Sequence, residues 1–170
     1  EAANALVAAG ASALAPASEA LADPRRDPAV RRAIPGVLER ISTPAAADVL
    51  AEHLLEGDAT LRLRALVALV HIRDQHPGIR LDPGSLEAAL GAEVLGHYRS
   101  YQILGQVASI DPGQETVERG LRAAMREELE RIFRLLDLLH PRRDFRSAWA
   151  ALRSGDAFIH DQALDLLDSA

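Results

Sequence analysis

The sequence predicts an all-α fold built from paired helices, and two observations lead to this prediction. Apolar residues make up 48% of the 170 residues and are dominated by Ala and Leu, which are the strongest helix formers, whereas the strand-favouring aromatic and β-branched residues are sparse. In addition, residues 27–41 (DPAVRRAIPGVLERI) align without a gap with residues 58–72 (DATLRLRALVALVHI). Self-similarity at such a short offset is typical of helical repeats. The apolar content also argues against disorder.

Each copy of the repeat begins with an aspartate and continues as an apolar helical face. We expect Asp27 and Asp58, and Asp156 in a third copy, to cap their helices, because a carboxylate accepts the free N–H groups of the first turn and favours the positive helix end. The apolar positions then recur at helical spacing, and such a face is buried only by stacking on neighbouring units. A third copy, residues 156–170, starts at Asp156 and has His160 where the other copies have Arg.

A shorter helix is predicted in front of each copy, at residues 12–21, 43–55 and 144–153. Thr43 is a typical capping residue followed by Pro44 at the first helical position, and Gly57 is a typical helix-ending residue. The unit is therefore a helix, a tight turn and a second helix. Three such units are expected, at about residues 12–41, 43–72 and 144–170.

The middle of the chain departs from this pattern. Residues 73–84 are predicted to be a connector, because two X-Pro steps and two Gly residues break a helix. Two longer helices are predicted after it, at about residues 85–109 and 112–139. The apolar positions of the first are Leu86, Leu90, Val94, Tyr98, Tyr101 and Leu104. Those of the second are Val117, Leu121, Met125, Leu129, Ile132, Leu136 and Leu139.

The second long helix also carries a charge pattern. Glu127 with Arg131, and Glu130 with Arg134, have the acid-first i, i+4 spacing of stabilising pairs. Three further arginines form a basic stripe: Arg119, Arg122 and Arg126. The stripe is interpreted as a solvated helix face, with contact to an anionic partner or membrane headgroups as the alternative.

The repeat resembles a known family. Asp27-x-x-Val30-Arg31 in one copy, and the same pattern from Asp58 to Arg62 in the next, are similar to the HEAT repeat in its short bacterial form. The resemblance implies a single-domain HEAT-type α-solenoid over residues 1–170, a right-handed superhelix of helical hairpins with the two longer helices in its middle. It also implies a hydrogen-bonded ladder between successive second helices, made by the Asp and Arg of each pair.

A second resemblance concerns residues 131–170, where RLLDLLHP, the helix start at Asp144 and LRSGD followed by ALDLLD occur. This stretch is similar to the cytosolic HEAT segment of bacterial transporters related to ATP/ADP translocases of the major facilitator type. The resemblance implies a cytoplasmic domain, at the cytosolic face of the inner membrane, that regulates or scaffolds a transporter. Its partner would be another protein or the membrane domain of the same protein.

The ends and the hydropathy of the chain are consistent with that interpretation. Glu1 is followed directly by a predicted helix at residues 2–9, so we expect the chain to be a segment of a longer protein. No apolar run approaches the roughly 18–20 residues that span a bilayer. Association with a membrane is therefore expected only through the full-length protein, and the oligomeric state is left open.

Several classes of chemistry are excluded or disfavoured by residue content. The chain has no Cys, and all nineteen of its basic residues are Arg, which rules out thiolate catalysis, Cys-based zinc sites and lysine chemistry. It has no glycine-rich phosphate loop and no G-x-S-x-G motif. His71, Asp74 and His76 lie close together, but a metal site needs three or four convergent ligands. We therefore expect no enzyme activity, metal or cofactor, and favour a non-catalytic protein-interaction or scaffold domain.

Two other functions remain as alternatives. The first is a HEAT-scaffold protein that binds or repairs nucleic acid, for which Arg31, Arg62 and Arg64 would line a basic concave face. The net charge of −6 disfavours it, since phosphate contacts usually require a basic excess. The second is a nucleotide site near Tyr98, Arg99 and Tyr101. The single Trp149 is expected in the core, with an exposed anchor for a partner protein as the alternative.

Overall fold

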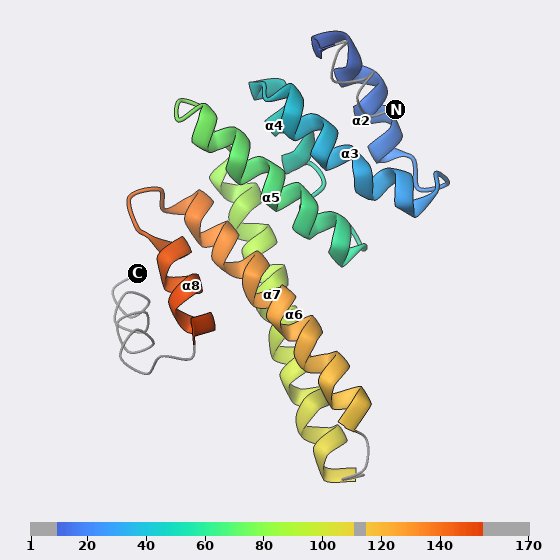
Figure 1. Cartoon of the computed structure of the whole chain (residues 1–170), viewed down its shortest axis with the longest axis vertical. Helices are drawn as coiled ribbons and strands as arrows, with labels where there is room; N and C mark the ends of the chain where they lie inside the picture. Colours follow the sequence, from blue (N-terminus) through green and yellow to red (C-terminus); the bar gives the residue numbers. More distant parts are fainter. Residues whose placement is uncertain (1–9, 111–114, 155–170) are drawn as a thin grey trace. The chain divides into compact units, whose positions relative to one another are not determined.

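The computed structural model of the chain describes residues 10–110 and 115–154, and within these ranges the chain is helical and contains no strand (Figure 1). The predicted all-α class is therefore confirmed for the described residues. The elements are a short 3-10 helix η1 (Gly10–Ala13) and the α-helices α2 (Leu14–Ala22), α3 (Pro28–Ile41), α4 (Pro44–Ala51), α5 (Ala59–Gln75), α6 (Pro83–Ile110), α7 (Glu115–Leu139) and α8 (Phe145–Ser154). The chain forms two compact units, Glu1–Ala89 and Leu90–Ala170, and α6 contributes to both.

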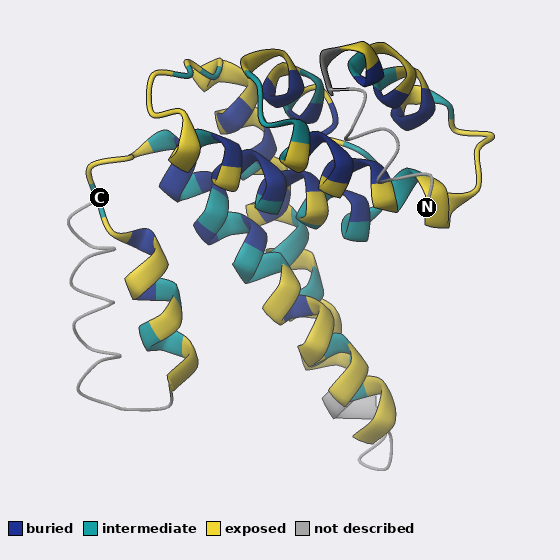
Figure 2. Ribbon diagram, turned by 45° about the horizontal axis from the view of Figure 1, so that its top comes forward, coloured by how far each residue is buried: buried dark blue, intermediate teal, exposed yellow. Residues whose placement is uncertain are grey.

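The first unit consists of two helical pairs whose longer helices are in contact. α2 packs on α3 and α4 packs on α5, while α3 and α5 also pack on each other. The apolar face of each helix is buried between these elements, as the dark blue segments of Figure 2 show. The largest fully buried side chains of this unit are Leu21, Pro35, Leu38, Leu50, Leu61, Leu66, Leu69, Val70 and Ile72.

The helix starts in this unit follow from local capping. Asp27 accepts a hydrogen bond from the N–H of Ala29 at 2.7 Å, so the carboxylate satisfies a first-turn donor of α3. Thr43 Oγ1 accepts from the N–H of Ala46 at 3.2 Å, at the start of α4. Asp58 Oδ1 accepts from the N–H groups of Thr60 and Leu61 at 3.0 and 3.2 Å, at the start of α5.

The helix ends differ modestly from the sequence-based expectation. α4 ends at Ala51 rather than near Leu55, because residues 52–55 form hydrogen-bonded turns that do not continue the helix. α5 continues three residues beyond Ile72, to Gln75. α3 ends where Ser42 adopts a left-handed conformation with φ of 49°, a common way to terminate a helix.

The second unit consists of α7, α8 and the part of α6 from Leu90 onward. α8 packs against α7 through a small apolar core of Phe133, Phe145 and Ala148. Trp149 joins this core, and its ring stacks on that of Phe133 with a centroid separation of 5.3 Å. α8 coincides with the first helix predicted for the third repeat unit.

Some expectations fall outside the described residues. They are the helix at residues 2–9 and the third repeat copy at residues 156–170, with Asp156 and His160. The two long helices are present close to their predicted bounds, and the segment between them, residues 111–114, is not described. Among the described helices, none is long and apolar enough to cross a membrane.

Candidate interaction surface on α6

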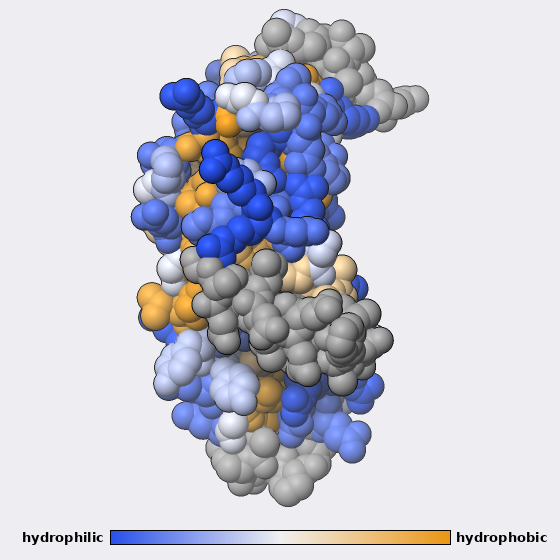
Figure 3. All heavy atoms as spheres, turned by 90° about the vertical axis from the view of Figure 1, so that its left-hand side faces the viewer, coloured by the Kyte–Doolittle hydropathy of each residue, from blue (hydrophilic) through white to orange (hydrophobic). Residues whose placement is uncertain are grey.

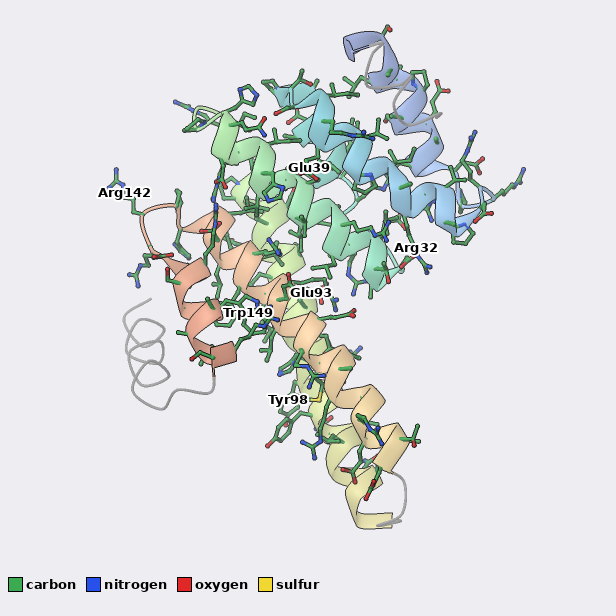
Figure 4. The ribbon with its side chains drawn as sticks, viewed as in Figure 1. Arg32, Glu39, Glu93, Tyr98, Arg142 and Trp149 are labelled. Carbon is green, nitrogen blue, oxygen red and sulfur yellow. The ribbon has the colours of Figure 1, made fainter. Side chains whose placement is uncertain are left out.

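The contact between α6 and α7 in the second unit includes several polar side chains. Glu93 and Arg131 are only 5% and 3% exposed, and Arg131 Nε lies 2.9 Å from Glu93 Oε1. The Nε–H group makes no well-directed hydrogen bond, so this is an ionic contact between two buried charges. Figure 4 shows Glu93 where α6 and α7 run together.

Two further contacts extend this polar face along α6. His97 Nδ1 lies 2.9 Å from one carboxylate oxygen of Glu128, and Ser100 Oγ donates to the other at 2.7 Å. Residues 93, 97 and 100 are separated by four and three positions, which places them on one side of a helix. That side of α6 is therefore the one directed at α7.

Several apolar residues of α6 lie on a different side. Val94, Tyr98 and Tyr101 have the same spacing as the polar set but are shifted by one residue, which is about 100° around the helix. Tyr98 and Tyr101 are 62% and 66% exposed, and Val94 and Leu95 are 48% and 59% exposed. We call these four residues the α6 face. The predicted apolar row of this helix is thus buried at Leu86, intermediate at Leu90 and Leu104, and exposed at Val94, Tyr98 and Tyr101.

The pictures agree with this arrangement. Figure 4 shows the Tyr98 side chain directed away from both α6 and α7. In the space-filling view, hydrophobic residues, drawn in orange, are exposed between hydrophilic ones in the lower part of the picture (Figure 3). Exposed apolar side chains that gather on one surface, rather than occurring singly, are typical of interaction sites.

The predicted basic stripe lies on another side of α7. Arg119, Arg122 and Arg126 are exposed, and Arg122 approaches Glu118 with a distance of 3.5 Å. No described residue pairs with Arg119 or Arg126. Helical spacing aligns Arg122 and Arg126 with Phe133, which faces α8, and not with the residues that face α6. The stripe and the α6 face are therefore separate surfaces.

One predicted ion pair of α7 is replaced by another. Glu130 and Arg134 form the expected contact at 2.6 Å. Arg131, however, pairs with Glu93 of α6 rather than with Glu127. The i, i+4 rule identifies neighbours on one helix only, and it does not anticipate that α6 places a buried carboxylate against this arginine.

The predicted Asp–Arg ladder of the first unit has different partners. Arg31 donates from Nε to the carbonyl of Leu21 at 2.9 Å and from Nη2 to Glu56 at 2.9 Å. The bond between second helices is instead made by Arg32, whose Nε donates to Asp58 Oδ2 at 2.7 Å. The next residue along the chain, and not Arg31, therefore connects α3 to the start of α5.

The remaining arginines of the predicted ladder and concave face also bond within the chain. Arg62 donates to the carbonyls of Glu56 and Gly57, in the turn that precedes α5. Arg64 donates to the carbonyl of Arg32 at 2.8 Å. These contacts tie α5 to the preceding turn and to α3.

The electrostatics of Asp58 reflect its two roles. Partial burial raises the pKa of this carboxyl, but the hydrogen bonds from Arg32 and from the N–H groups of Leu61 and Thr60 outweigh that effect. The pKa of Asp58 therefore lies below its ordinary value, because these donors stabilise the charged form. The carboxylate acts as a structural anion at the junction of α3 and α5.

The histidines of the described residues each contact a neighbouring side chain or carbonyl and do not converge on one point. His71 Nδ1 lies 2.6 Å from Glu39, and His76 Nε2 lies 2.7 Å from the carbonyl of Ser42. No group of three or more His, Asp or Glu side chains suited to a metal ion occurs among the residues that the structure describes.

An open depression of about 620 Å³ adjoins the end of α5. It is lined by Pro44, Asp48, Gln75, His76, Pro77, Gly78, Ile79 and Arg80.

Most of the described polar side chains therefore make structural contacts, and the α6 face is an exposed apolar surface that no described contact explains. The sequence alone identified Tyr98 and Tyr101 as apolar positions of this helix and as part of an alternative nucleotide site.

The chain matches no protein-family model, no curated protein and no solved structure.

Proposed function

We propose that this chain is a non-catalytic protein-interaction domain that binds its partner through the α6 face. The observation that carries the proposal is the exposure of Tyr98 and Tyr101 on one face of a well-formed helix. Tyrosine is enriched at the energetic centres of protein interfaces, because it buries a large rigid ring and keeps a hydroxyl for hydrogen bonding. Val94 and Leu95 supply adjoining apolar surface.

The polar contact between α6 and α7 supports this assignment. A helix that only completed a core would direct its largest apolar side chains inward. α6 instead uses Glu93, His97 and Ser100 against α7 and leaves its tyrosines outside. The hydrogen-bonded and ionic contacts set the rotation of α6, and this rotation presents the α6 face to a partner.

We further propose that the scaffold is a HEAT-type α-solenoid with right-handed stacking. Support comes from the two helix pairs of the first unit, in which each longer helix begins at a capping aspartate, Asp27 or Asp58. The contact between α3 and α5, with Arg32 bonded to Asp58, is consistent with stacked repeat units.

On the resemblance of residues 131–170, the domain would be a cytosolic regulatory appendage of a membrane transporter. The test is to delete this domain from the full-length protein and to measure transport and its regulation. A change in regulated transport, reproduced by Tyr98→Ser with Tyr101→Ser in the intact protein, is the expected result. Unchanged transport and regulation after the deletion would contradict the transporter proposal.

The interaction proposal is tested separately by site-specific photo-crosslinking in cells that make the full-length protein. A photoreactive amino acid replaces Tyr98 or Tyr101, and in the control it replaces Ile103, which is also exposed but lies on the far side of α6. We expect a discrete adduct from the two tyrosine positions and none from position 103. Equal adducts from all three positions, or none, would overturn the proposal.

A further inference from the structure

Three glycines within α6 have no explanation in the packing of the described chain. A Cβ added to Gly91, Gly96 or Gly105 would meet nothing within 4 Å. Glycine inside a helix is less favourable than alanine, because it loses more conformational freedom on folding. An alanine would fit at all three positions, so packing within the described chain does not require glycine there. Close approach of a second helix to α6 would require it.

Two of these glycines extend the row of residues that forms most of the α6 face. Gly91, Val94, Tyr98, Tyr101 and Gly105 follow each other at intervals of three, four, three and four residues. This is the heptad spacing with which one helix packs along another. We call these five residues the heptad row; its centre is large and aromatic, and its ends are small.

The heptad row is complementary to itself in the antiparallel direction. If two copies of α6 meet with the midpoint between Tyr98 and Tyr101 on a twofold axis, Tyr98 of one copy lies opposite Tyr101 of the other. Val94 then lies opposite Gly105, so the branched side chain enters the space that the glycine leaves. A twofold interface requires this reciprocity, because the same patch serves on both subunits.

We propose that the α6 face and the glycines beside it bind a second copy of this chain, with the two α6 helices antiparallel. The proposal rests on the proposed function and names the partner of that same surface. The two α7 helices, each held to its own α6 by Glu93–Arg131 and His97–Glu128, would extend the contact into a four-helix arrangement.

The low charge of the α6 face favours a second copy of this chain over a strongly charged partner. Between Val94 and Val107 the only residue with a formal charge at neutral pH is Arg99. Glu93, just before the α6 face, is buried against Arg131. Two chains of net charge −6 can therefore approach through this face without placing like charges opposite one another, a juxtaposition that opposes association.

The area available predicts a modest affinity. With roughly 200 Å² per tyrosine side chain, the exposed fractions of Tyr98 and Tyr101 (62% and 66%) correspond to roughly 250 Å² per copy. A standard interface buries about 800 Å² per partner, so the rest must come from Val94, Leu95 and the adjoining surface of α7. The dimer is expected to dissociate on dilution.

The chain has no cysteine, which permits a direct test by disulfide formation. In the double variant Val94→Cys with Gly105→Cys, the two positions of one helix are eleven residues, or about 16 Å, apart. A disulfide requires Cα atoms within about 7 Å, so no bond forms within one chain. The antiparallel dimer brings each new cysteine opposite its counterpart, and we expect a covalent dimer under mild oxidation.

The single variant Val94→Cys is the matched control. In the antiparallel arrangement its two cysteines are again about 16 Å apart, and the protein should stay monomeric on a denaturing gel. Equal dimer formation by the single and double variants would overturn the antiparallel arrangement.

Sedimentation equilibrium provides a second test. The unmodified protein should show a concentration-dependent dimer that is weakened by Gly105→Leu and unaffected by Gly96→Ala. A monomer at all concentrations, with no disulfide dimer, would overturn the inference.

The photo-crosslinking experiment separates this inference from the proposed function. An adduct of two copies at position 98 supports both. An adduct with a different protein supports the proposed function and overturns the inference. The absence of any adduct at positions 98 and 101 overturns the proposed function itself. Circular dichroism of each variant, compared with the unmodified protein, establishes that the helices are intact.

Discussion

Arg32 of α3 donates a hydrogen bond to Oδ2 of Asp58, the residue that caps α5, over a distance of 2.7 Å. The other oxygen of the same carboxylate accepts from the first turn of α5. One side chain therefore both starts a helix and joins it to the helix of the preceding pair. Asp27 caps α3 in the same way through Ala29, which makes the two aspartates a natural comparison.

Replacing Asp58 should cost more stability than replacing Asp27. Loss of a capping side chain to alanine costs about 1 kcal/mol, with a range of roughly 0.5–2. Asp58→Ala also removes the contact with Arg32, which is partly exposed and contributes about 0.2–1 kcal/mol. Urea unfolding followed by circular dichroism measures both changes. Equal losses for Asp27→Ala and Asp58→Ala would show that the bond to Arg32 contributes nothing.

Stability should fall on acidification, and Asp58 should contribute to the fall. Hydrogen bonds hold the pKa of Asp58 below its ordinary value of 3.8 despite partial burial. A lowered pKa in the folded state means that its contribution is complete above pH 3.8 and is lost as pH falls through the lower folded value. Asp144, whose pKa is lowered by hydrogen bonds from the side chain and backbone of Ser147, acts in the same direction.

The measurement is the midpoint of thermal unfolding between pH 6 and pH 2. Asp58→Asn keeps a side-chain oxygen for the cap but does not titrate, so its midpoint should decrease less steeply with falling pH than that of the unmodified protein. Parallel curves for the two proteins would contradict the role assigned to the Asp58 carboxylate.

Breaking the buried pair of the second unit should be costly, whereas replacing both partners should not. Glu93→Ala leaves Arg131 as a buried charge without its carboxylate, and such changes cost about 3–5 kcal/mol. The double variant Glu93→Leu with Arg131→Met removes both charges and should be close to neutral or more stable. Guanidinium unfolding compares the three proteins. A double variant as unstable as Glu93→Ala would contradict this prediction.

The core between α7 and α8 provides its own optical probe. Phe145 is fully buried, and Trp149, the only tryptophan of the chain, packs in the same cluster on Phe133. Phe145→Ala should cost about 3–5 kcal/mol, the usual range for removing a buried aromatic ring. The emission of Trp149 should shift to longer wavelength at a lower denaturant concentration than in the unmodified protein. An unchanged transition would show that α8 does not depend on this core.

Nucleic-acid binding is expected to be absent. Arg31, Arg62 and Arg64, the residues proposed for a basic concave face, all donate to acceptors within the chain. A gel-shift experiment with single- and double-stranded DNA at low salt should show no complex, since low salt gives phosphate contacts their greatest strength. A complex that weakens steeply with added salt would favour the nucleic-acid alternative instead.

The features that the sequence predicted well depend on local interactions. The starts of α3, α4 and α5 follow from Asp27, Thr43 and Asp58, each of which bonds to an N–H group two or three residues away. The extent of α6 and α7 follows from uninterrupted helical periodicity. Caps and periodicity are properties of neighbouring residues, so they can be read without knowing which helices pack together.

The sequence by itself therefore determined the helical class of the described residues and their main helix starts. Only the tertiary structure decided that Arg32 rather than Arg31 reaches Asp58, and that Arg131 pairs with Glu93 rather than Glu127. These choices depend on the rotation and offset of one helix against another, which sequence spacing within a single helix does not contain. For the same reason the tertiary structure alone placed Tyr98 on the outside of α6, because the polar contacts with α7 set the rotation of that helix.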